Sequence, residues 1–341
     1  MSTAPFAFGI GIGTKNSHGA WLEVFFKTPV FEPSNEIIEA AKQLGDGCTI
    51  EPSAEQWKAF ATQLEALGEN DQAALALKAS ESKAPAVLVA LEDNSAPQTV
   101  AAVYLKLQLL SNRLVKPHGA DLSGAFGVLP NVAWTNKGAI DLNELADAQL
   151  EARLAGEVLS VDSVDKFPKM TDYVVPTGVR IADTARVRLG AYLGEGTTIM
   201  HEGFVNFNAG TEGPGMIEGR ISAGVFVGKG SDLGGGCSTM GTLSGGNNVV
   251  ISIGDACLIG ANAGVGIPLG DRCTVEAGLY VTGASKVAVL DETGATATVV
   301  KAAELAGKSD LLFRRNSQSG AVECLTNNSA IELNEALHTN N

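Results

Sequence analysis

Aliphatic residues recur every six positions in the second half of the chain, and this period constrains the fold more than any other feature. The first run consists of Ile181, Val187, Leu193, Ile199 and Val205. Three further runs keep the same spacing: Ile221, Val227 and Leu233; Ile253, Ile259 and Val265; and Leu269, Val275, Val281 and Val287. A period of six is neither the 3.6 of an α-helix nor the alternation of an ordinary strand. It predicts a mainly β protein with a parallel β-helix, in which short strands coil around a narrow core.

Small residues surround the aliphatic positions, as a narrow coil requires. Two positions before them the chain carries residues such as Ala185, Ala191 and Thr197. A turn-forming residue often follows directly, for example Gly194 or Asn206. Glycine reaches the backbone angles of a tight corner without a Cβ clash. The pattern therefore favours a coil of short strands over a generic glycine-rich sheet.

Composition and charge exclude several classes of protein. A length of 341 residues allows two or three domains. The net charge is −14 and no basic run is present, which argues against a nucleic-acid partner. We find neither a signal peptide nor an apolar run of the roughly 18 residues that a membrane helix needs. The five cysteines are odd in number and scattered, so we expect a reducing, cytoplasmic location.

The first 175 residues have the mixed pattern of an α+β domain. The expected strands are 6–12, 21–30 and 85–91, and the run Gly9–Gly13 is a strand because its spacing does not fit a dinucleotide fingerprint. Four helices are expected: one that begins after Ser34, and three at 54–67, 100–114 and 141–154. Ser34 and Asp141 are the expected caps of the first and the last, and Ser53 with Gln56 forms a capping box for the second. The sequence thus predicts an N-terminal domain over 1–175, a β-helix over 176–290 and a C-terminal extension over 291–341.

The hexad pattern is interrupted twice, at 206–220 and at 234–248. A regular coil gains nothing from such segments, and loops that leave a rigid scaffold often carry function. We therefore expect two functional loops there. After Val287 the hexads fade, and a hairpin with its turn at 291–294 is expected, followed by a polar tail over 334–341.

Four motifs resemble one enzyme family, the longer-chain branch of the tetrahydrodipicolinate N-succinyltransferases. They are MHEGFVNFNAGT (200–211), MIEGRISAG (216–224), GTLSGG (241–246) and LFRRNS (312–317). The resemblance implies a left-handed β-helix, a homotrimer and a step of lysine and diaminopimelate biosynthesis. It also implies small-molecule substrates: succinyl passes from succinyl-CoA, the co-substrate, to the amine of ring-opened tetrahydrodipicolinate.

Glu218 is the candidate catalytic residue. Transfer from a thioester to an amine requires removal of a proton from the amine and a donor for the oxyanion. Glu218 lies three residues before an inward-facing isoleucine, so we expect its carboxylate to face outward, since burial in a narrow core would be costly. The matching glutamate of the family has been given a covalent role through an acyl anhydride. General-base catalysis explains the residue equally well, and the sequence does not separate the two roles.

The resemblance implies a CoA site made of several short segments. Arg220 has the forked guanidinium that suits a carboxylate, and the clearest basic group of this acidic chain, Lys301 with 314–317, suits phosphates. The matching positions of the family are Arg220, Gly235, Ser238, Ala261, Glu276, Ala277, Gly283, Ala284, Lys301, Arg314, Arg315, Asn316 and Ser317. Gly283 and Ala284 match two small residues that stand in the opposite order in the family. At these two positions we therefore expect contact with CoA through the backbone.

Glu202 is the candidate metal ligand. In some members of the family, the matching residue and an acidic residue seventeen positions earlier bind magnesium on the trimer axis. That earlier position is Ala185 in this chain, so half of the site is missing. Magnesium favours carboxylate oxygens, and Mg²⁺ at the trimer axis stays an expectation that rests on Glu202 alone.

Other activities on the same scaffold are less well supported. The main alternative is a hexapeptide-repeat acyltransferase for a different amine or an amino sugar, but such enzymes commonly use a histidine base and only His201 lies in the coil. A hydratase of the carbonic anhydrase type needs about three histidine ligands, and the four histidines are dispersed. A spacer without enzymatic activity would not need the two interruptions.

Overall fold

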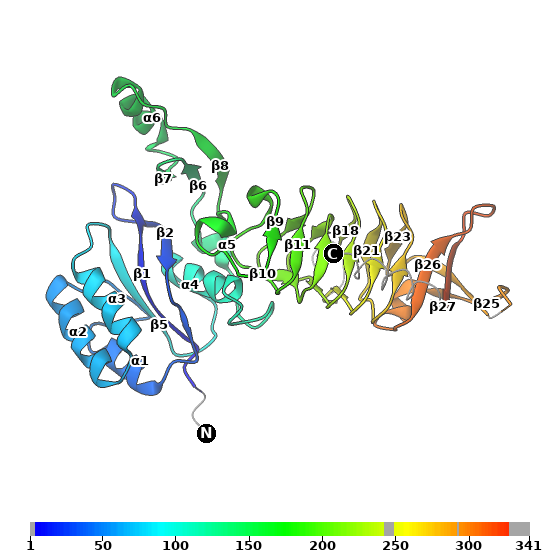
Figure 1. The fold of residues 1–341 in the computed structure, drawn as a ribbon, viewed down its shortest axis with the longest axis horizontal. Helices are drawn as coiled ribbons and strands as arrows, with labels where there is room; N and C mark the ends of the chain where they lie inside the picture. Colours follow the sequence, from blue (N-terminus) through cyan, green and yellow to red (C-terminus); the bar gives the residue numbers. More distant parts are fainter. Residues whose placement is uncertain (1–3, 242–248, 292, 327–341) are drawn as a thin grey trace. The chain divides into compact units, whose positions relative to one another are not determined.

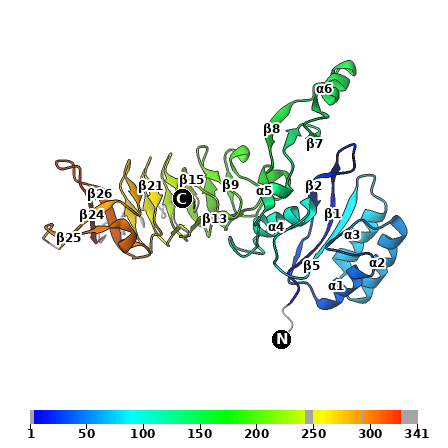
Figure 2. The ribbon, with the colours of Figure 1, turned by 180° about the vertical axis from the view of Figure 1, so that it is seen from behind.

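The structure is a computed structural model that describes residues 4–241, 249–291 and 293–326. It divides into two compact units, one of residues 1–115 with 119–168 and one of 116–118 with 169–341. Figures 1 and 2 draw the fold from two opposite sides. No helix in the described ranges is long and apolar enough to span a lipid bilayer.

An antiparallel sheet and four helices form the larger part of the first unit. The strands are β1 (Ala7–Lys15), β2 (Trp21–Phe26), β3 (Val30–Phe31), β4 (Thr49–Ile50) and β5 (Ala86–Leu91), in the order β2-β1-β5-β4 with β3 beside β1. The helices are α1 (Asn35–Lys42), α2 (Ala54–Ala66), α3 (Asn70–Ser80) and α4 (Val100–Ser111). In Figures 1 and 2, α1 to α3 cover one face of the sheet and α4 covers the other.

Alternation along β1 separates the two faces of this sheet. Phe8 and Ile10 belong to the core that includes α1, α2 and α3. Gly9 points to the other face, where a Cβ would lie 2.7 Å from Phe26 Cδ1 and 2.9 Å from Leu105 Cδ1 of α4. Glycine in a strand often marks such a close approach. The prediction of a strand at 9–13 is therefore confirmed, and its glycines have a packing reason.

Helix caps were predicted correctly in two of three cases. Ser53 Oγ accepts from the Gln56 N–H (3.3 Å) and Gln56 Oε1 accepts from the Ser53 N–H (2.9 Å), so α2 has its capping box. Ser34 likewise caps α1. The expected cap at Asp141 is wrong, because this residue ends strand β7 and its carboxylate accepts from Asn16 Nδ2 at 2.8 Å.

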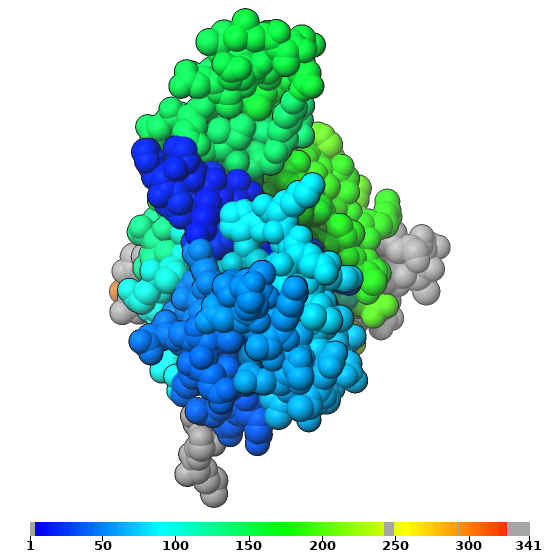
Figure 3. All heavy atoms as spheres, turned by 90° about the vertical axis from the view of Figure 1, so that its left-hand side faces the viewer, coloured from blue at the N-terminus to red at the C-terminus, as the bar shows by residue number. Residues whose placement is uncertain are grey.

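A smaller sheet completes the first unit. It consists of β6 (Val132–Thr135), β7 (Gly138–Asp141) and β8 (Val161–Asp165) in the order β7-β6-β8, with helices α5 (Ala125–Val128) and α6 (Leu145–Leu154) beside it in the chain. The tip of the β1–β2 hairpin reaches this sheet, because the Ser17 N–H also donates to Glu144 Oε1 at 2.8 Å. Figure 3 shows this tip, in dark blue, against the green segment that carries α6.

The second unit is a parallel β-helix whose strands stack into three sheets. The first sheet contains β10 (Ala191–Leu193), β13 (Ala209–Thr211), β16 (Phe226–Val227) and β19 (Ser252–Ile253). The second contains β9 (Arg180–Ile181), β11 (Thr197–Ile199), β14 (Gly215–Ile217), β17 (Asp232–Leu233), β20 (Leu258–Ile259), β22 (Thr274–Val275) and β26 (Leu311–Arg315). The third contains β12 (Phe204–Val205), β15 (Arg220–Ile221), β18 (Ser238–Thr239), β21 (Gly264–Gly266) and β23 (Tyr280–Thr282).

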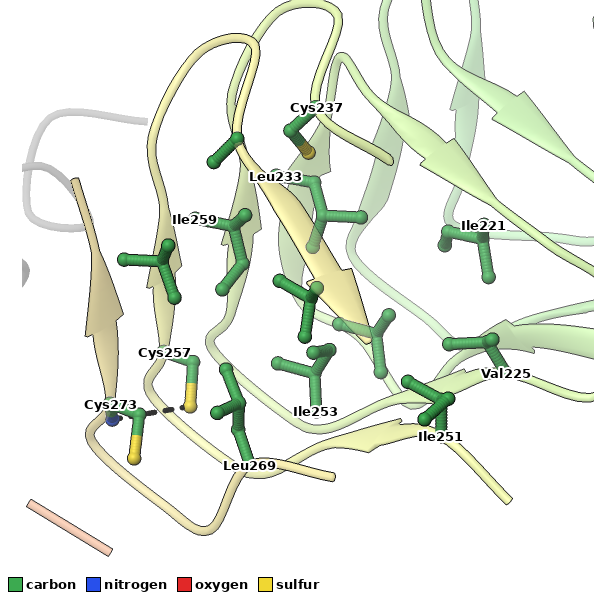
Figure 4. Close-up of a cluster of buried hydrophobic side chains, with 14 of the residues drawn as sticks. Ile221, Val225, Leu233, Cys237, Ile251, Ile253, Cys257, Ile259, Leu269 and Cys273 are labelled. Carbon is green, nitrogen blue, oxygen red and sulfur yellow. Dashed lines mark hydrogen bonds between the residues drawn. The ribbon is translucent and has the colours of Figure 1, made fainter. Parts of the chain in front are cut away.

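The hexad residues form the core of this coil, as predicted. Ile199, Ile217, Leu233, Ile259 and Val275 are paired in register from strand to strand in the second sheet. All five are at most 1% exposed. Figure 4 shows the aliphatic side chains and the buried cysteines pointing into the same interior. Each coil alone buries little apolar surface, so the stacking of coils supplies the core.

The predicted loop at 206–220 is wrong, because the coil continues through it. Thr211 of β13 and Ile217 of β14 keep the six-residue step from Val205, and both are fully buried. A polar threonine at an inward position and a four-residue step to Ile221 hid the pattern. In the second interruption, β18 also continues the coil, and the Met240 N–H still donates to the Val265 carbonyl at 2.8 Å. Residues 242–248, which include most of the GTLSGG motif, lie outside the described residues.

Shorter elements complete the second unit. The 3₁₀ turn η1 (Met170–Asp172) precedes the coil, and the 3₁₀ turn η2 (Thr184–Arg186) follows its first strand, β9. The expected hairpin is confirmed by β24 (Lys286–Leu290) and β25 (Thr296–Lys301), which pair antiparallel. They are followed by η3 (Ala302–Leu305) and by β27 (Val322–Thr326), which pairs with β24 and β26. The tail at 334–341 lies outside the described residues.

Candidate active site

Six of the fifteen predicted site residues lie on one edge of the coil. This edge is where the second sheet turns into the third, and we call it the Glu218 edge. It consists of the corners 200–203, 218–219, 234–237, 260–263 and 276–279, one above the other. The coil thus places Glu218, Gly235, Ala261 and Ala277 in successive layers, although each is up to 26 positions from the next in the sequence.

The corner that carries Glu218 is shorter than its neighbours. Two residues, Glu218 and Gly219, join β14 to β15, whereas four residues form each of the other corners of this edge. Gly219 lies directly on Cys237 of the next coil, and any side chain at Gly219 would overlap Cys237 Sγ. Glu218 is half-buried, and its carboxylate makes no hydrogen bond or ion pair with the described residues.

Cys237 does not supply a nucleophile. Its side chain is buried beneath the short corner, and burial raises the pKa of the thiol to about 12. The reactive form of cysteine is the thiolate, and this thiol stays protonated near neutral pH. The half-buried carboxylate of Glu218 is therefore the polar side chain that this corner offers to a ligand.

Gly235 is the immediate neighbour of Glu218 on the next coil. A Cβ built on Gly235 would lie 3.4 Å from Glu218 Oε2, so the backbone of Gly235 passes close to the carboxylate. The carbonyl of Gly235 accepts from the Asn262 N–H at 2.9 Å. Its own N–H has no acceptor among the described residues. An amide donor is thus available beside the carboxylate.

The same vacant donor recurs at the second position of three successive corners. Like Gly235, Ala261 and Ala277 have amide N–H groups without an acceptor in the described part of the chain. The third positions, Gly236, Asn262 and Gly278, have φ values of 69°, 56° and 73°. The three corners therefore have one geometry, and their free donors recur about every 4.8 Å, the spacing of neighbouring strands. We call Gly235, Ala261 and Ala277 the amide ladder.

Equivalent corners on another edge of the coil are closed. Where the first sheet turns into the second, the second-position residues are Lys229, Asp255 and Asp271. Their N–H groups donate to Asp255 Oδ1 (2.7 Å), Asp271 Oδ1 (2.9 Å) and Ser309 Oγ (3.0 Å) of the next coil. The chain thus caps these donors on one edge and leaves the ladder donors open on the Glu218 edge.

Two further predicted residues flank the amide ladder on the third sheet. Arg220 of β15 and Ser238 of β18 are paired in register, so they occupy adjacent outward positions. The Arg220 side chain is exposed and makes no ion pair within the described residues. The edge therefore offers a carboxylate, free amide donors and a cationic fork together.

The arginine segment closes one end of the Glu218 edge. The Arg315 N–H donates to Glu276 Oε2 at 2.6 Å, and Arg315 Nη1 donates to the Gly320 carbonyl at 3.0 Å. Arg314 is committed to the buried carboxylate of Glu323 (Nε–Oε2 2.9 Å), and Asn316 Nδ2 donates to the same carboxylate at 2.7 Å. Arg315 therefore makes no ion pair within the described residues, whereas Arg314 and Asn316 fix the segment through Glu323.

Gly283, Ala284 and Lys301 are not brought to the Glu218 edge. Gly283 and Ala284 follow β23, so they lie at the far end of that strand from Ala277. Lys301 is close to them, because the Ala302 and Ala303 N–H groups donate to the carbonyls of Ser285 and Gly283. These three residues form a separate group on the opposite edge of the third sheet.

Glu202 lies on the Glu218 edge but does not fit a magnesium site within one chain. Its Oε1 is 3.0 Å from His201 Nδ1, and both side chains are exposed. Arg186 holds this corner by donating to the Glu202 carbonyl at 2.9 Å. In the described ranges, no group of three or more His, Cys, Asp or Glu side chains is placed to hold a metal ion.

The short corner and its support by Gly219 and Cys237 were not predicted from the sequence. The signal was present, because the inward positions Ile217 and Ile221 are four residues apart instead of six. Reading 206–220 as a loop concealed this shift. The amide ladder had no sequence signal, since a free N–H depends on what the neighbouring coil offers.

Two family profiles match the chain. One, described as the middle part of tetrahydrodipicolinate N-succinyltransferase, matches residues 129–169. The other, described as the hexapeptide repeat of succinyl-transferase, matches residues 246–283.

Named proteins match over the whole length. The chain is 65% identical to the 2,3,4,5-tetrahydropyridine-2,6-dicarboxylate N-succinyltransferase of Pseudomonas aeruginosa, with 100% of both chains covered. It is 59% identical to the protein of the same name from Vibrio cholerae, covering 99% of this chain and all of that one. A crystal structure of a putative 2,3,4,5-tetrahydropyridine-2-carboxylate N-succinyltransferase from Campylobacter jejuni has a TM-score of 0.86 at 34% identity, over 96% of this chain and 94% of that chain.

Proposed function

The chain belongs to the tetrahydrodipicolinate N-succinyltransferase family, and from this premise we propose the reaction and the residues that perform it. It is a CoA-dependent acyltransferase of lysine and diaminopimelate biosynthesis. It moves succinyl from succinyl-CoA to the amino group of ring-opened tetrahydrodipicolinate, and the products are the N-succinyl amide and free CoA.

The open amide ladder is the observation that carries the assignment of the CoA site. Glu218, Gly235, Ala261, Ala277 and Arg315 occupy successive coils, so four steps of about 4.8 Å, or about 19 Å in all, separate the carboxylate from the arginine. This is of the order of an extended pantetheine arm. The arm's two amide carbonyls accept from ladder N–H groups, and its diphosphate pairs with Arg315.

The chemistry then takes place between Glu218 and Gly235. The amine nitrogen attacks the thioester carbon, and the Gly235 N–H stabilises the oxyanion that forms. Collapse of the tetrahedral intermediate breaks the C–S bond, the amide forms, and the thiolate of CoA leaves. In the general-base route, Glu218 takes the amine proton and returns it to the thiolate.

A covalent route uses the same carboxylate. Glu218 then attacks the thioester, releases CoA and holds succinyl as an anhydride, which the amine opens. Single-turnover mixing with succinyl-CoA alone separates the two routes. Release of one thiol per subunit and a succinylated Glu218 peptide identify the covalent route, whereas no release without the amine identifies the general base.

Arg220 supplies the recognition of the succinyl group. Its free guanidinium lies on the strand that directly follows Glu218, and its fork pairs with a carboxylate in a bidentate manner. Acetyl-CoA lacks that carboxylate. Ser238, at the neighbouring outward position, adds a hydroxyl donor beside the acyl group.

The overall reaction is tested by incubating the purified protein with succinyl-CoA and L-2-aminopimelate and following free thiol. We expect thiol release that requires both substrates, with acetyl-CoA and glucosamine as parallel controls. Thiol release with an amino sugar but not with aminopimelate would instead support the alternative, a hexapeptide-repeat acyltransferase that acts on a different substrate.

Other features follow from the same family membership. We propose that the coil is left-handed, that the chain forms a homotrimer, and that it works in the cytoplasm. Residues 1–175, 176–290 and 291–341 are proposed as an N-terminal domain, the acyltransferase coil and a C-terminal extension. Gly283, Ala284 and Lys301 are proposed to contact a more distant part of the CoA molecule.

No step of this mechanism passes through magnesium. One exposed carboxylate beside a histidine, Glu202 with His201, is a poor match for an ion that prefers an octahedral set of oxygens. We therefore expect dialysis against EDTA to leave thiol release unchanged, with added MgCl₂ as the comparison. Loss of activity that magnesium restores would contradict this.

A further inference from the structure

Tyr280 has an unusual position on the third sheet. The outward positions of the neighbouring strands are Ser238, Gly264 and Tyr280, in register. A methyl group on Gly264 would overlap Cδ1 and Cε1 of Tyr280, so the ring lies directly on the backbone of β21. Glycine weakens a strand unless something approaches closely, and here the tyrosine ring is what approaches.

The ring is held in place and yet open to a ligand. Its inner side rests on Gly264, whereas Tyr280 as a whole is 53% exposed. The second outward glycine of β21, Gly266, is covered in the same way, because a Cβ there would lie 2.8 Å from Met240 Sδ. The two glycines of β21 are thus covered by the side chains of Tyr280 and Met240, which come from neighbouring segments.

The position of the ring relative to the amide ladder points to a role. Tyr280 follows the corner that contains Ala277, and its ring leans over Gly264, which follows the corner of Ala261. The ring therefore lies in the layer of Ala261, the middle member of the amide ladder, and on the third sheet, whose next strand carries Ser238. An arm bound to the ladder through its carbonyls would have this ring along its flank.

We propose that Tyr280 is a further binding residue, whose ring packs against the apolar part of the pantetheine arm of the acyl-CoA. Pantetheine alternates amide groups with methylene and dimethyl groups. The ladder satisfies the amides, and an aromatic face held in one orientation removes the apolar groups from water with little loss of conformational freedom. This inference rests on the proposed function, because it assumes that an acyl-CoA lies along the Glu218 edge.

The test compares Tyr280→Ala with Tyr280→Phe in the full-length protein. We expect Tyr280→Ala to raise the KM for succinyl-CoA about tenfold, with kcat and the KM for aminopimelate within about twofold of wild type. Tyr280→Phe keeps the ring and should behave like wild type. Val299→Ala, at an exposed position of β25, is the matched control for loss of a surface apolar side chain.

Shortened donors locate the contact. Succinyl-pantetheine keeps the arm and should show the same loss with Tyr280→Ala, whereas succinyl-N-acetylcysteamine lacks most of the arm and should show none. An unchanged KM for succinyl-CoA, or an equal loss with both shortened donors, would overturn the proposal. A change of assembly state in sedimentation velocity would also overturn it, because the ring would then serve contact between subunits.

These outcomes are distinct from failure of the proposed function. If the wild-type protein released no thiol from succinyl-CoA and aminopimelate, the assigned reaction would be wrong whatever Tyr280 does. Calorimetric titration with CoA itself then still tests the ring. Weaker CoA binding by Tyr280→Ala would support the binding role, and equal binding would refute it.

Discussion

At the scale of single residues, the proposed active site depends on one carboxylate at a corner that is two residues shorter than the neighbouring corners. Glu218 is half-buried beside the free N–H of Gly235, and Gly219 lets the corner lie on Cys237. The short corner and the bare glycine backbone leave the carboxylate accessible. Backbone hydrogen bonds to the next coil, such as that from the Glu218 N–H to the Leu233 carbonyl at 2.8 Å, hold the corner in the structure without substrates.

Glu218→Gln keeps the size of the side chain and removes its charge. We expect kcat to fall by at least about 10²-fold, since proton transfer by a placed side chain contributes 10² to 10⁴. The KM for succinyl-CoA should change little, because the ladder and Arg315 remain. Thiol release at saturating substrates measures the effect, and Glu202→Gln, an exposed glutamate of the same edge, is the control. A rate close to wild type would exclude Glu218 from the chemistry.

At the scale of elements, the proposed CoA site is built from four-residue corners of the coil. In the corner of Ala261, the Ala263 N–H donates to the Gly260 carbonyl at 3.1 Å, and the third residue has positive φ. This resembles a type II turn, which accepts proline at its second position. Proline there removes the amide donor and leaves the turn intact.

Ala261→Pro therefore tests the amide ladder directly. We expect a rise of roughly five- to tenfold in the KM for succinyl-CoA, which corresponds to one net hydrogen bond, and an unchanged thermal midpoint. Ala261→Ser retains the N–H and is the matched control. A proline variant that binds succinyl-CoA as well as the serine variant would show that the ladder donors do not contact the co-substrate.

The β26–β27 hairpin depends on the ionised form of Glu323. The amide of Asn316, and then the guanidinium of Arg314, hold the pKa of this carboxyl below its usual range. A carboxyl whose pKa is lowered by folding adds stability above its unfolded-state pKa and loses it as pH falls through the lowered folded-state value.

Glu323→Gln should therefore lower the thermal midpoint at pH 7, and the difference from wild type should shrink as the pH falls below about 4. Differential scanning calorimetry across this range measures it. A difference that stays constant with pH would mean that packing, and not charge, accounts for the role of Glu323. Because the hairpin carries Arg315, we also expect a higher KM for succinyl-CoA in this variant.

At the scale of the whole molecule, the three sheets of the coil give flat faces that can pack around a threefold axis. We expect light scattering to give the mass of three chains, and activity to fall when dilution dissociates them. A monomer with full specific activity would contradict the proposed trimer. In our proposal the residues of one chain form both the catalytic carboxylate and the CoA site, so dilution chiefly tests whether the dicarboxylate site needs a second chain.

The sequence by itself determined the type of fold and singled out Glu218 as the residue that we propose to be reactive. A six-residue period has few structural solutions, because inward positions of a narrow coil accept only small or aliphatic side chains. Helices with a serine cap were also predictable, since a cap is a local hydrogen bond between neighbours such as Ser53 and Gln56. Asp141 failed as a cap because it pairs with Val132 as the last residue of strand β7, and α6 begins only at Leu145.

The tertiary structure alone decided which residues share a site. Position in the chain does not reveal that Gly235, Ala261 and Ala277 stack on the Glu218 edge, or that Lys301 lies on another edge. It also does not reveal which backbone donors stay free, because this depends on whether the next coil provides an acceptor. Asp255 and Asp271 provide one on one edge, whereas no described side chain does so for the amide ladder. Hydrogen bonds between coils depend on register across many residues, and register exists only once the coil has formed.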